Sequence, residues 1–534
     1  MSKVMKMGKT SATGSYHLFL GKIASSLMLG IGTILVGMFI AEGDLGLYTI
    51  ALIPAGTFLL FQDWGISAAL TKYCAAYKDT EREGELRNII VKGLSFGAIT
   101  ALALTLLSLL TANFVTSTIF GNSESVFMVT LASTTILSAA IYGICISIFV
   151  GFERMKLSTI AMIISAIVQG ILSPLLVYLG FGALGALVGF TVSSGVSAIT
   201  ALTLLYFIIF KKLPIGNFPK PKFFKTLKPL LHYGFPISIA SIIGGLSPQI
   251  TAFAMASFTD LAIIGNYRIA INFAVFLTFF IFPIQTVLFP AFSKLNPLKD
   301  KQLLKTVFAS SIKYSSLFLV PATLGLIVLG APLINAIYGE KWLSAPLFLA
   351  LNIMGNLLVL VGSMSYSRLL YATGETKLIM KLETLKTCIA VPFAFLLIPS
   401  FGIFGVIASG ILGGMPPALI GIYLTWRRYE TKADFHNSFR IFLASTIAGV
   451  TTYLFLITSA LASWILLIGG AVIFLVIYII SIALVGAVNQ MDIDNLRIMF
   501  SGLGPISKLL GILLILIEKP LKVKEKFSKM RKLK

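Results

Sequence analysis

The sequence predicts an all-α polytopic membrane protein with about fourteen transmembrane helices, arranged as two pseudo-symmetric six-helix lobes plus two C-terminal helices. Three observations carry this prediction. The chain is 57% hydrophobic and only 12% charged, about half the charged fraction of a soluble domain. Apolar runs of roughly 20 or more residues recur along its whole length, and each can cross a ~30 Å hydrocarbon core as a helix. The part of the chain that ends at Trp426 also contains an internal repeat. Because the apolar runs are continuous and not alternating, helices are favoured over a β-barrel.

The distribution of lysine and arginine predicts the orientation of the chain. Basic connections alternate with connections near 42–45, 116–125, 180–181, 259–262, 399–401 and 461–463 that contain no lysine or arginine. In the stretches that we read as outside loops, Lys341 is the only basic residue. Since basic loops stay in the cytoplasm, we expect a multi-pass protein of the plasma membrane with both termini cytoplasmic.

The repeat consists of several motif pairs that occur in the same order and at a nearly constant offset along the chain. The pairs are Gly46-Leu47-Tyr48 with Gly265-Asn266-Tyr267, Ile119-Phe120-Gly121 with Ile337-Tyr338-Gly339, Lys156-Leu157 with Lys377-Leu378, Pro174 with Pro392, and Phe181-Gly182-Ala183-Leu184-Gly185 with Phe401-Gly402-Ile403-Phe404-Gly405. Six spans return the chain to its starting side, so an axis along the membrane normal should relate the halves, as in one class of transporters. Two such lobes can rock about a central cleft, which favours alternating access over a static scaffold.

These patterns give a predicted domain organisation. It comprises a cytoplasmic N-terminus (1–16), a first six-helix lobe (17–210), a basic, proline-rich cytoplasmic linker (211–232), a second six-helix lobe (233–426), two further transmembrane helices (441–488) and a basic amphipathic cytoplasmic tail (489–534).

Several classes of function are disfavoured. The net charge of +22 would suggest a nucleic-acid partner in a soluble protein, but here basic loops facing anionic membrane lipids explain it better. The three cysteines and three histidines show no disulfide or metal spacing. The chain lacks an ATP-binding loop, an evident catalytic carboxylate pair and a long outside loop. We therefore expect a transporter that is not an enzyme, with no catalytic residues, no metal and no cofactor.

Ionisable residues within the predicted spans are the candidate functional groups, because burying a charge in the membrane is costly. The basic candidates for substrate binding are Lys22, Arg268, Lys313 and Arg368. Arg268 replaces the Thr49 of the first repeat on the side that otherwise excludes positive charge, and a guanidinium can hold a phosphate with two parallel hydrogen bonds. The alternative for all four is that the side chain extends to the nearest headgroups.

The acidic candidates are Asp63, Asp44 and Glu42, which we expect to serve ion coupling or internal pairing. Asp63 lies past the midpoint of its predicted span, and a carboxylate there needs a cation, a basic side chain or water. Glu42 and Asp44 lie at the outer end of the first span.

The chain resembles the polysaccharide-export flippases of the multidrug/oligosaccharidyl-lipid/polysaccharide superfamily over residues 15 to about 430. The resemblance rests on Gly46-Leu47-Tyr48, on Asp63-Trp64-Gly65-Ile66 leading to Thr71-Lys72-Tyr73, on Gly374-Glu375-Thr376-Lys377, and on the paired motifs above, together with the arrangement of six, six and two spans.

The resemblance implies a flippase that moves a lipid-linked oligosaccharide, on a polyprenyl phosphate or pyrophosphate, from the inner to the outer leaflet for surface glycan assembly. It implies glycosyltransferases or a polymerase of the same pathway as partners. Two alternatives remain at this stage: a cation-coupled multidrug exporter of the same superfamily, and a membrane glycan polymerase or ligase. The second half has few buried acids, which disfavours the exporter.

Overall fold

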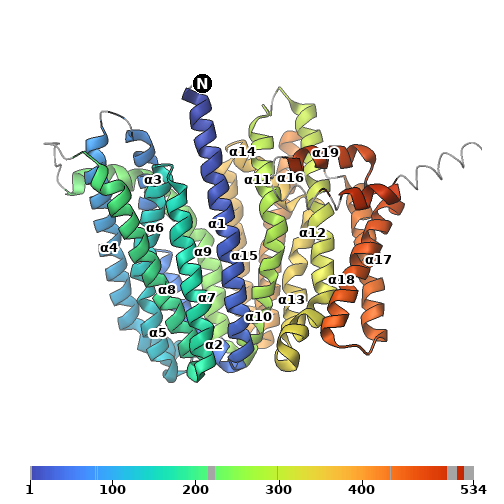
Figure 1. Cartoon of the computed structure of the whole chain (residues 1–534), viewed down its shortest axis with the longest axis horizontal. Helices are drawn as coiled ribbons and strands as arrows, with labels where there is room; N and C mark the ends of the chain where they lie inside the picture. The colour runs from blue at the N-terminus through green and yellow to red at the C-terminus, as the bar shows by residue number, and fades with distance from the viewer. Residues whose placement is uncertain are drawn as a thin grey trace, which may run out of the picture. The chain divides into compact units, whose positions relative to one another are not determined.

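The structure is a computed structural model that describes residues 3–78, 80, 82–214, 223–297, 299–432, 434–501, 511 and 514–521. Within these ranges the regular elements are helices, as predicted (Figure 1). Part of the predicted linker (215–222) and much of the predicted basic tail (502–510, 512–513 and 522–534) lie outside the described residues.

The chain divides into two compact units. The first comprises Met1–Arg268 with Thr387–Gly410, and the second comprises Ile269–Lys386 with Ile411–Lys534. These units do not coincide with the two predicted lobes, because α9 and the start of α10 belong to the first unit. The predicted lobe boundaries stay a prediction.

The first unit contains nine complete helices in its described residues, with the start of α10 and parts of α15 and α16. Their bounds are α1 (Lys3–Phe39), α2 (Glu42–Leu59), α3 (Ile66–Tyr77), α4 (Glu83–Phe114), α5 (Val126–Ser133), α6 (Thr135–Gly151), α7 (Met155–Leu176), α8 (Gly182–Leu204), α9 (Phe223–Phe258), α10 (Leu261–Ala274), α15 (Thr376–Phe401) and α16 (Ile403–Tyr429).

The end of α10, the start of α15 and the end of α16 belong to the second unit, which also contains the remaining labelled α-helices of the described residues. They are α11 (Thr278–Ser293), α12 (Lys301–Tyr338), α13 (Ala345–Ile353), α14 (Ser363–Ala372), α17 (Phe435–Thr458), α18 (Ser463–Val485) and α19 (Gln490–Ser501). Here α12 packs against α17 and α18, which lie side by side (Figure 1). The Tyr478 hydroxyl of α18 donates a hydrogen bond of 2.7 Å to the Leu317 carbonyl of α12.

Eleven helical segments of the described chain are long and apolar enough to cross a membrane, or up to twelve if the bent pair Ala345–Val361 and Ser363–Ala372 forms one span. The predicted count of fourteen is therefore not confirmed. One of the eleven segments, Met155–Lys212, is 58 residues long, well above the ~20 residues that one span needs. It turns at Gly180 and Gly182, whose φ angles of +92° and +49° favour glycine.

Small residues and short polar bonds hold the helices of the first unit together. Gly32 of α1 faces Gly170 of α7, where a Cβ on Gly32 would lie 2.6 Å from the Gly170 Cα. Ser108 of α4 bonds Ser133 of α5 at 2.7 Å in a buried position. Such contacts are typical of membrane helices, because lipid supplies no hydrophobic force between them.

Candidate functional site

A basic pocket lies in the second unit, where α15 begins and α16 ends. Its volume is about 480 Å³, within the range of ~300–1,000 Å³ that is usual for ligand sites. Its lining consists of Leu370, Glu375, Lys377, Leu378, Lys381, Leu424, Arg427 and Arg428. We call this the α15–α16 pocket. Four bases and one acid give its lining a formal charge of +3.

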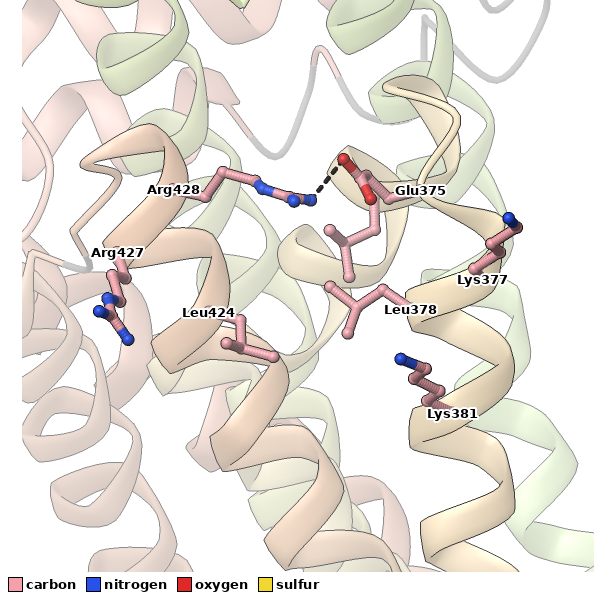
Figure 2. A pocket seen from close by; sticks show the side chains of 8 residues that line it. Glu375, Lys377, Leu378, Lys381, Leu424, Arg427 and Arg428 are labelled. Carbon is pink, nitrogen blue, oxygen red and sulfur yellow. Dashed lines mark ion pairs between the residues drawn. The ribbon is translucent and has the colours of Figure 1, made fainter.

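A tight turn between α14 and α15 shapes one wall of the pocket. Gly374 has a φ of +77°, which a side chain would strain. The turn lets the Glu375 amide donate to the Leu370 carbonyl at 2.9 Å, so that α15 starts directly at the pocket. Glu375 forms an ion pair with Arg428 from the last turn of α16 (Figure 2).

Figure 2 shows how the remaining side chains are arranged around this ion pair. Lys381 extends from α15 towards the space between the two helices, near Leu378 and Leu424. Lys377 and Arg427 extend to either side and are exposed. The pocket thus combines an apolar floor with cationic edges, which suits a ligand that joins an anionic group to an apolar one.

A second ion pair joins the start of α12 to the residue that follows α16. Lys305 of α12 lies 2.5 Å from the Glu430 carboxylate, which follows α16. The hydrogen bond from Lys305 and its positive charge hold the pKa of the Glu430 carboxyl below its usual range. This contact ties the start of α12 to the end of α16.

The α15–α16 pocket is a site that the sequence did not predict. Lys381, Arg427 and Arg428 counted only among the basic residues that set the predicted orientation, while Lys377 also belonged to a repeat pair and to a motif of the family resemblance. The available signal was Gly374-Glu375-Thr376-Lys377, where a glycine turn places an acid and a base together. That Arg428, on a later helix, faces Glu375 depends on the packing of the helices.

Lys313, a predicted phosphate contact, has an acidic partner in the structure. Its Nζ lies 2.6 Å from an Asp492 carboxylate oxygen, and the two side chains are 14% and 9% exposed. Asp492 also accepts a hydrogen bond from the Tyr314 hydroxyl at 3.3 Å and one from the Asn489 amide at 2.9 Å. This network fixes α19 to α12.

The other residue predicted in the second unit is Arg368. It lies on α14, half-buried, with its guanidinium carbon 6.0 Å from the centre of the Tyr371 ring. Leu370 of the α15–α16 pocket follows it by two positions on the same helix, and such positions do not share a face.

Glu42 and Arg268 lie at a crossing of α2 and α10 in the first unit. Asn266, which is 4% exposed, donates to the Glu42 carboxylate at 2.7 Å and to the Ala262 carbonyl at 3.0 Å. Arg268 is half-buried and lies two positions farther along α10. Glu42 is thus paired with an amide through a strong, charge-assisted hydrogen bond.

Gly46 and Gly265, which are paired in the repeat, allow α2 and α10 to cross at close distance. A Cβ on Gly46 would lie 1.9 Å from the Leu261 carbonyl oxygen, and a Cβ on Gly265 would lie 2.2 Å from the Glu42 carbonyl oxygen. Glu42 corresponds to Leu261 at the same offset that relates Gly46 to Gly265 in the repeat. The contact is therefore reciprocal, as a two-fold relation between the two repeats requires.

The remaining predicted residues lie elsewhere in the first unit. The Asp63 carboxylate accepts hydrogen bonds from the Ser67 amide at 3.0 Å and the Ser67 hydroxyl at 2.6 Å, so it satisfies an amide in the first turn of α3. Asp44 lies against Gly182 at the start of α8. Lys22 is exposed on α1, next to Gly21, which faces Thr159 of α7.

No cluster of potential metal ligands is found in the part of the chain that the structure describes. There, no group of three or more His, Cys, Asp or Glu side chains is placed to hold an ion.

Two family models match the chain. The model described as polysaccharide biosynthesis protein matches residues 11–296, more than half of the chain. The model described as lipid II flippase MurJ matches residues 237–481. Together the two matches extend from the first predicted span to the last.

One curated relative is the lipopolysaccharide biosynthesis protein WzxC of Escherichia coli K12. It is 31% identical over 187 residues, which cover 35% of this chain and 36% of the relative.

Two solved structures share the fold. The inward closed conformation of the lipid II flippase MurJ covers 88% of this chain and 98% of its own, with 17% identity and a TM-score of 0.71. A multidrug resistance MATE family transporter of the MOP superfamily, facing inward, covers 76% and 94%, with 18% identity and a TM-score of 0.59.

Proposed function

The chain belongs to the polysaccharide biosynthesis protein family, the polysaccharide flippases of the MOP superfamily, and on this premise we propose that it moves a lipid-linked oligosaccharide from the inner to the outer leaflet. The family match over more than half of the chain is the observation that carries the proposal. The likeness to the MurJ fold over 88% of the chain supports a flippase architecture.

The physical problem for such a protein is the sugar headgroup. Each unpaired hydroxyl costs several kcal/mol, on the order of 2–7, when it enters hydrocarbon. A hydrated path between helices removes that cost, and basic side chains along it neutralise the phosphate that joins sugar and lipid. We propose Lys22, Arg268, Lys313 and Arg368 as contacts of that phosphate, and Asp63, Asp44 and Glu42 as groups for ion coupling or internal pairing.

The multidrug exporter is the second candidate, because a MATE transporter shares the fold. Its structural likeness is smaller in both TM-score and coverage than that of MurJ. We also propose that the protein is a transporter and not an enzyme, that both termini are cytoplasmic, and that glycosyltransferases or a polymerase act in the same pathway.

Reconstitution in vesicles tests the proposal directly. The purified protein is placed in vesicles that contain a lipid-linked oligosaccharide, and a lectin added outside reports the sugar of the outer leaflet. In protein-free vesicles the sugar of the inner leaflet stays protected from the lectin. With the protein present, we expect this sugar to become accessible to the lectin with time. Equal protection with and without protein would contradict the proposal.

The same vesicle assay distinguishes the flippase from the multidrug exporter and from the glycan polymerase. Uptake or release of an amphipathic cation such as ethidium, without movement of the glycolipid, would favour the multidrug exporter. Longer glycan chains in the mass spectrum of the recovered lipid would favour a polymerase. Unchanged glycan length together with a change of leaflet would favour the flippase.

A further inference from the structure

We propose that the α15–α16 pocket binds the phosphate group of a lipid headgroup at the inner face of the membrane. The inference deepens the proposed function and rests on it in one respect, the identification of the carrier as one source of that phosphate. The other source is an anionic lipid of the inner leaflet. Both present the same chemistry, a phosphate joined to an apolar chain.

The positions of the lysines argue against a purely structural explanation of the charge. Lys377 is the second residue of α15 and Lys381 the sixth. The first turn of a helix carries a partial positive charge and exposed amide donors, so the cation of Lys377 is unfavourable for the helix itself, whereas Lys381 lies one turn farther along α15. An anion, in contrast, is attracted by the lysines and by the helix start together.

The internal repeat offers a comparison at the same depth. In the register that aligns Lys156 with Lys377, the partner of Lys381 is Ile160 and the partner of Glu375 is Arg154. In the register that aligns Gly182 with Gly402, the partners of Arg427 and Arg428 are Phe207 and Ile208.

The first repeat thus has apolar residues where the second has three of its cations. Ile160 and Phe207 are 43% and 58% exposed, so an apolar side chain is compatible with this position of the fold. The general preference for basic residues on the inner side is satisfied in the first repeat without them. The cations of the second repeat therefore need a reason of their own, and an anionic ligand supplies one.

The lining also matches the size and polarity of a lipid phosphate. Three leucines, Leu370, Leu378 and Leu424, provide apolar contact for the first carbons of a chain. Arg428 is held by Glu375, which orients its guanidinium while leaving other N–H donors for a ligand. The carboxylate at the same time reduces the positive charge, so Glu375 limits the affinity of the pocket for anions.

The test uses the purified full-length protein in an uncharged detergent and isothermal titration calorimetry. The probes are geranyl diphosphate, short-chain phosphatidic acid, short-chain phosphatidylcholine and inorganic pyrophosphate. The variant K377Q/K381Q removes both lysines of the pocket. The matched control K211Q/K212Q removes two exposed lysines that follow α8 in the first repeat, with the same change in net charge.

We expect K377Q/K381Q to raise the Kd of geranyl diphosphate by about tenfold or more, because charge-assisted hydrogen bonds are lost. K211Q/K212Q should change it by less than about twofold, as expected for exposed charges. Glu375→Gln should lower the Kd. Monodispersity and the unfolding midpoint show whether each variant is folded, and Glu375→Gln keeps the test valid if the double variant fails to fold.

The probes then identify the source of the phosphate. Binding of geranyl diphosphate alone supports the lipid carrier, and equal binding of phosphatidic acid supports any phosphate headgroup. Inorganic pyrophosphate binding as tightly as the lipids would overturn the lipid part of the proposal. Equal effects of the two double variants, or no effect of Glu375→Gln, would overturn the site itself. This experiment measures binding and not transport. A failure of the flippase assay would therefore not change its outcome.

Discussion

At the scale of single residues, the ion pair of Lys313 and Asp492 shows how the structure changes the interpretation of a charged residue. The sequence places Lys313 alone on an apolar run, which indicates a functional cation. The structure gives it a carboxylate at 2.6 Å with both side chains largely buried. Removing one member of a buried pair leaves the other charge without compensation.

We expect Asp492→Ala to destabilise the protein by about 3–5 kcal/mol, the usual cost of breaking a buried ion pair. The double variant K313M/D492L should recover much of this loss, because it removes both charges and fills the space with apolar groups. Unfolding midpoints in detergent measure the difference. A double variant as unstable as Asp492→Ala would show that the lost hydrogen bonds to Tyr314 and Asn489 matter more than the charge.

The vesicle assay on the same double variant addresses the predicted role of Lys313. If the lysine contacts phosphate, the stable K313M/D492L protein should lose glycolipid movement. If its role is to hold α19, the stable double variant should keep it.

Asp63 marks the limit of sequence reasoning at this scale. Its place in an apolar region predicted a carboxylate that needs a cation, a basic side chain or water, whereas the structure gives it the amide and hydroxyl of Ser67. The sequence did not identify Ser67 as its partner, because this required knowing that a new helix, α3, begins at Ile66. A helix interruption in a continuously apolar stretch has no strong signal other than the Trp64-Gly65 pair, whose φ angles are +46° and +76°.

At the scale of elements, the crossing of α2 and α10 depends on the absence of two side chains. The Cβ positions on Gly46 and Gly265 would lie 1.9 and 2.2 Å from backbone oxygens. Backbone cannot rotate aside as a side chain can, so the helices would have to separate. The bond between Asn266 and Glu42 would lengthen with them.

We expect Gly46→Ala or Gly265→Ala to destabilise the protein by about 1–3 kcal/mol, as for overpacking in a tight core. Gly43→Ala is the matched control, since it lies in the same helix and a Cβ there meets nothing within 4 Å. Unfolding midpoints of the three variants give the comparison. Equal unfolding midpoints for Gly43→Ala and Gly46→Ala would show that the two helices can move apart at the crossing without a loss of stability.

Most helices could be predicted because an apolar run in a membrane has few other solutions. Their boundaries followed the charges and the glycine turns, as at Gly180 and Gly182. The contacts between elements could not be predicted in the same way. The ion pair of Arg428 and Glu375 joins the end of one helix to the start of another, and nothing in either local sequence selects the other.

At the scale of the whole molecule, the proposed transport gives a direct test of the predicted basic contacts. We expect K22A/R268A to abolish surface glycan export while the protein stays folded, because it removes two cations that we propose as contacts of the carrier phosphate. The control K211A/K212A removes equal charge from the residues that follow α8. Surface glycan in cells and the lectin assay in vesicles provide the measurements. Normal export by K22A/R268A would remove both residues from the proposed site.

The reciprocal contact of Gly46 and Gly265 has the form of an interface in a symmetric homodimer. In such a dimer, one surface patch meets its own copy, and every contact occurs twice. Here the two copies are parts of a single polypeptide, joined by a connector. A half-length chain with this glycine would carry both sides of the crossing by itself. The crossing therefore has, within one polypeptide, the geometry that two identical chains would form about a two-fold axis.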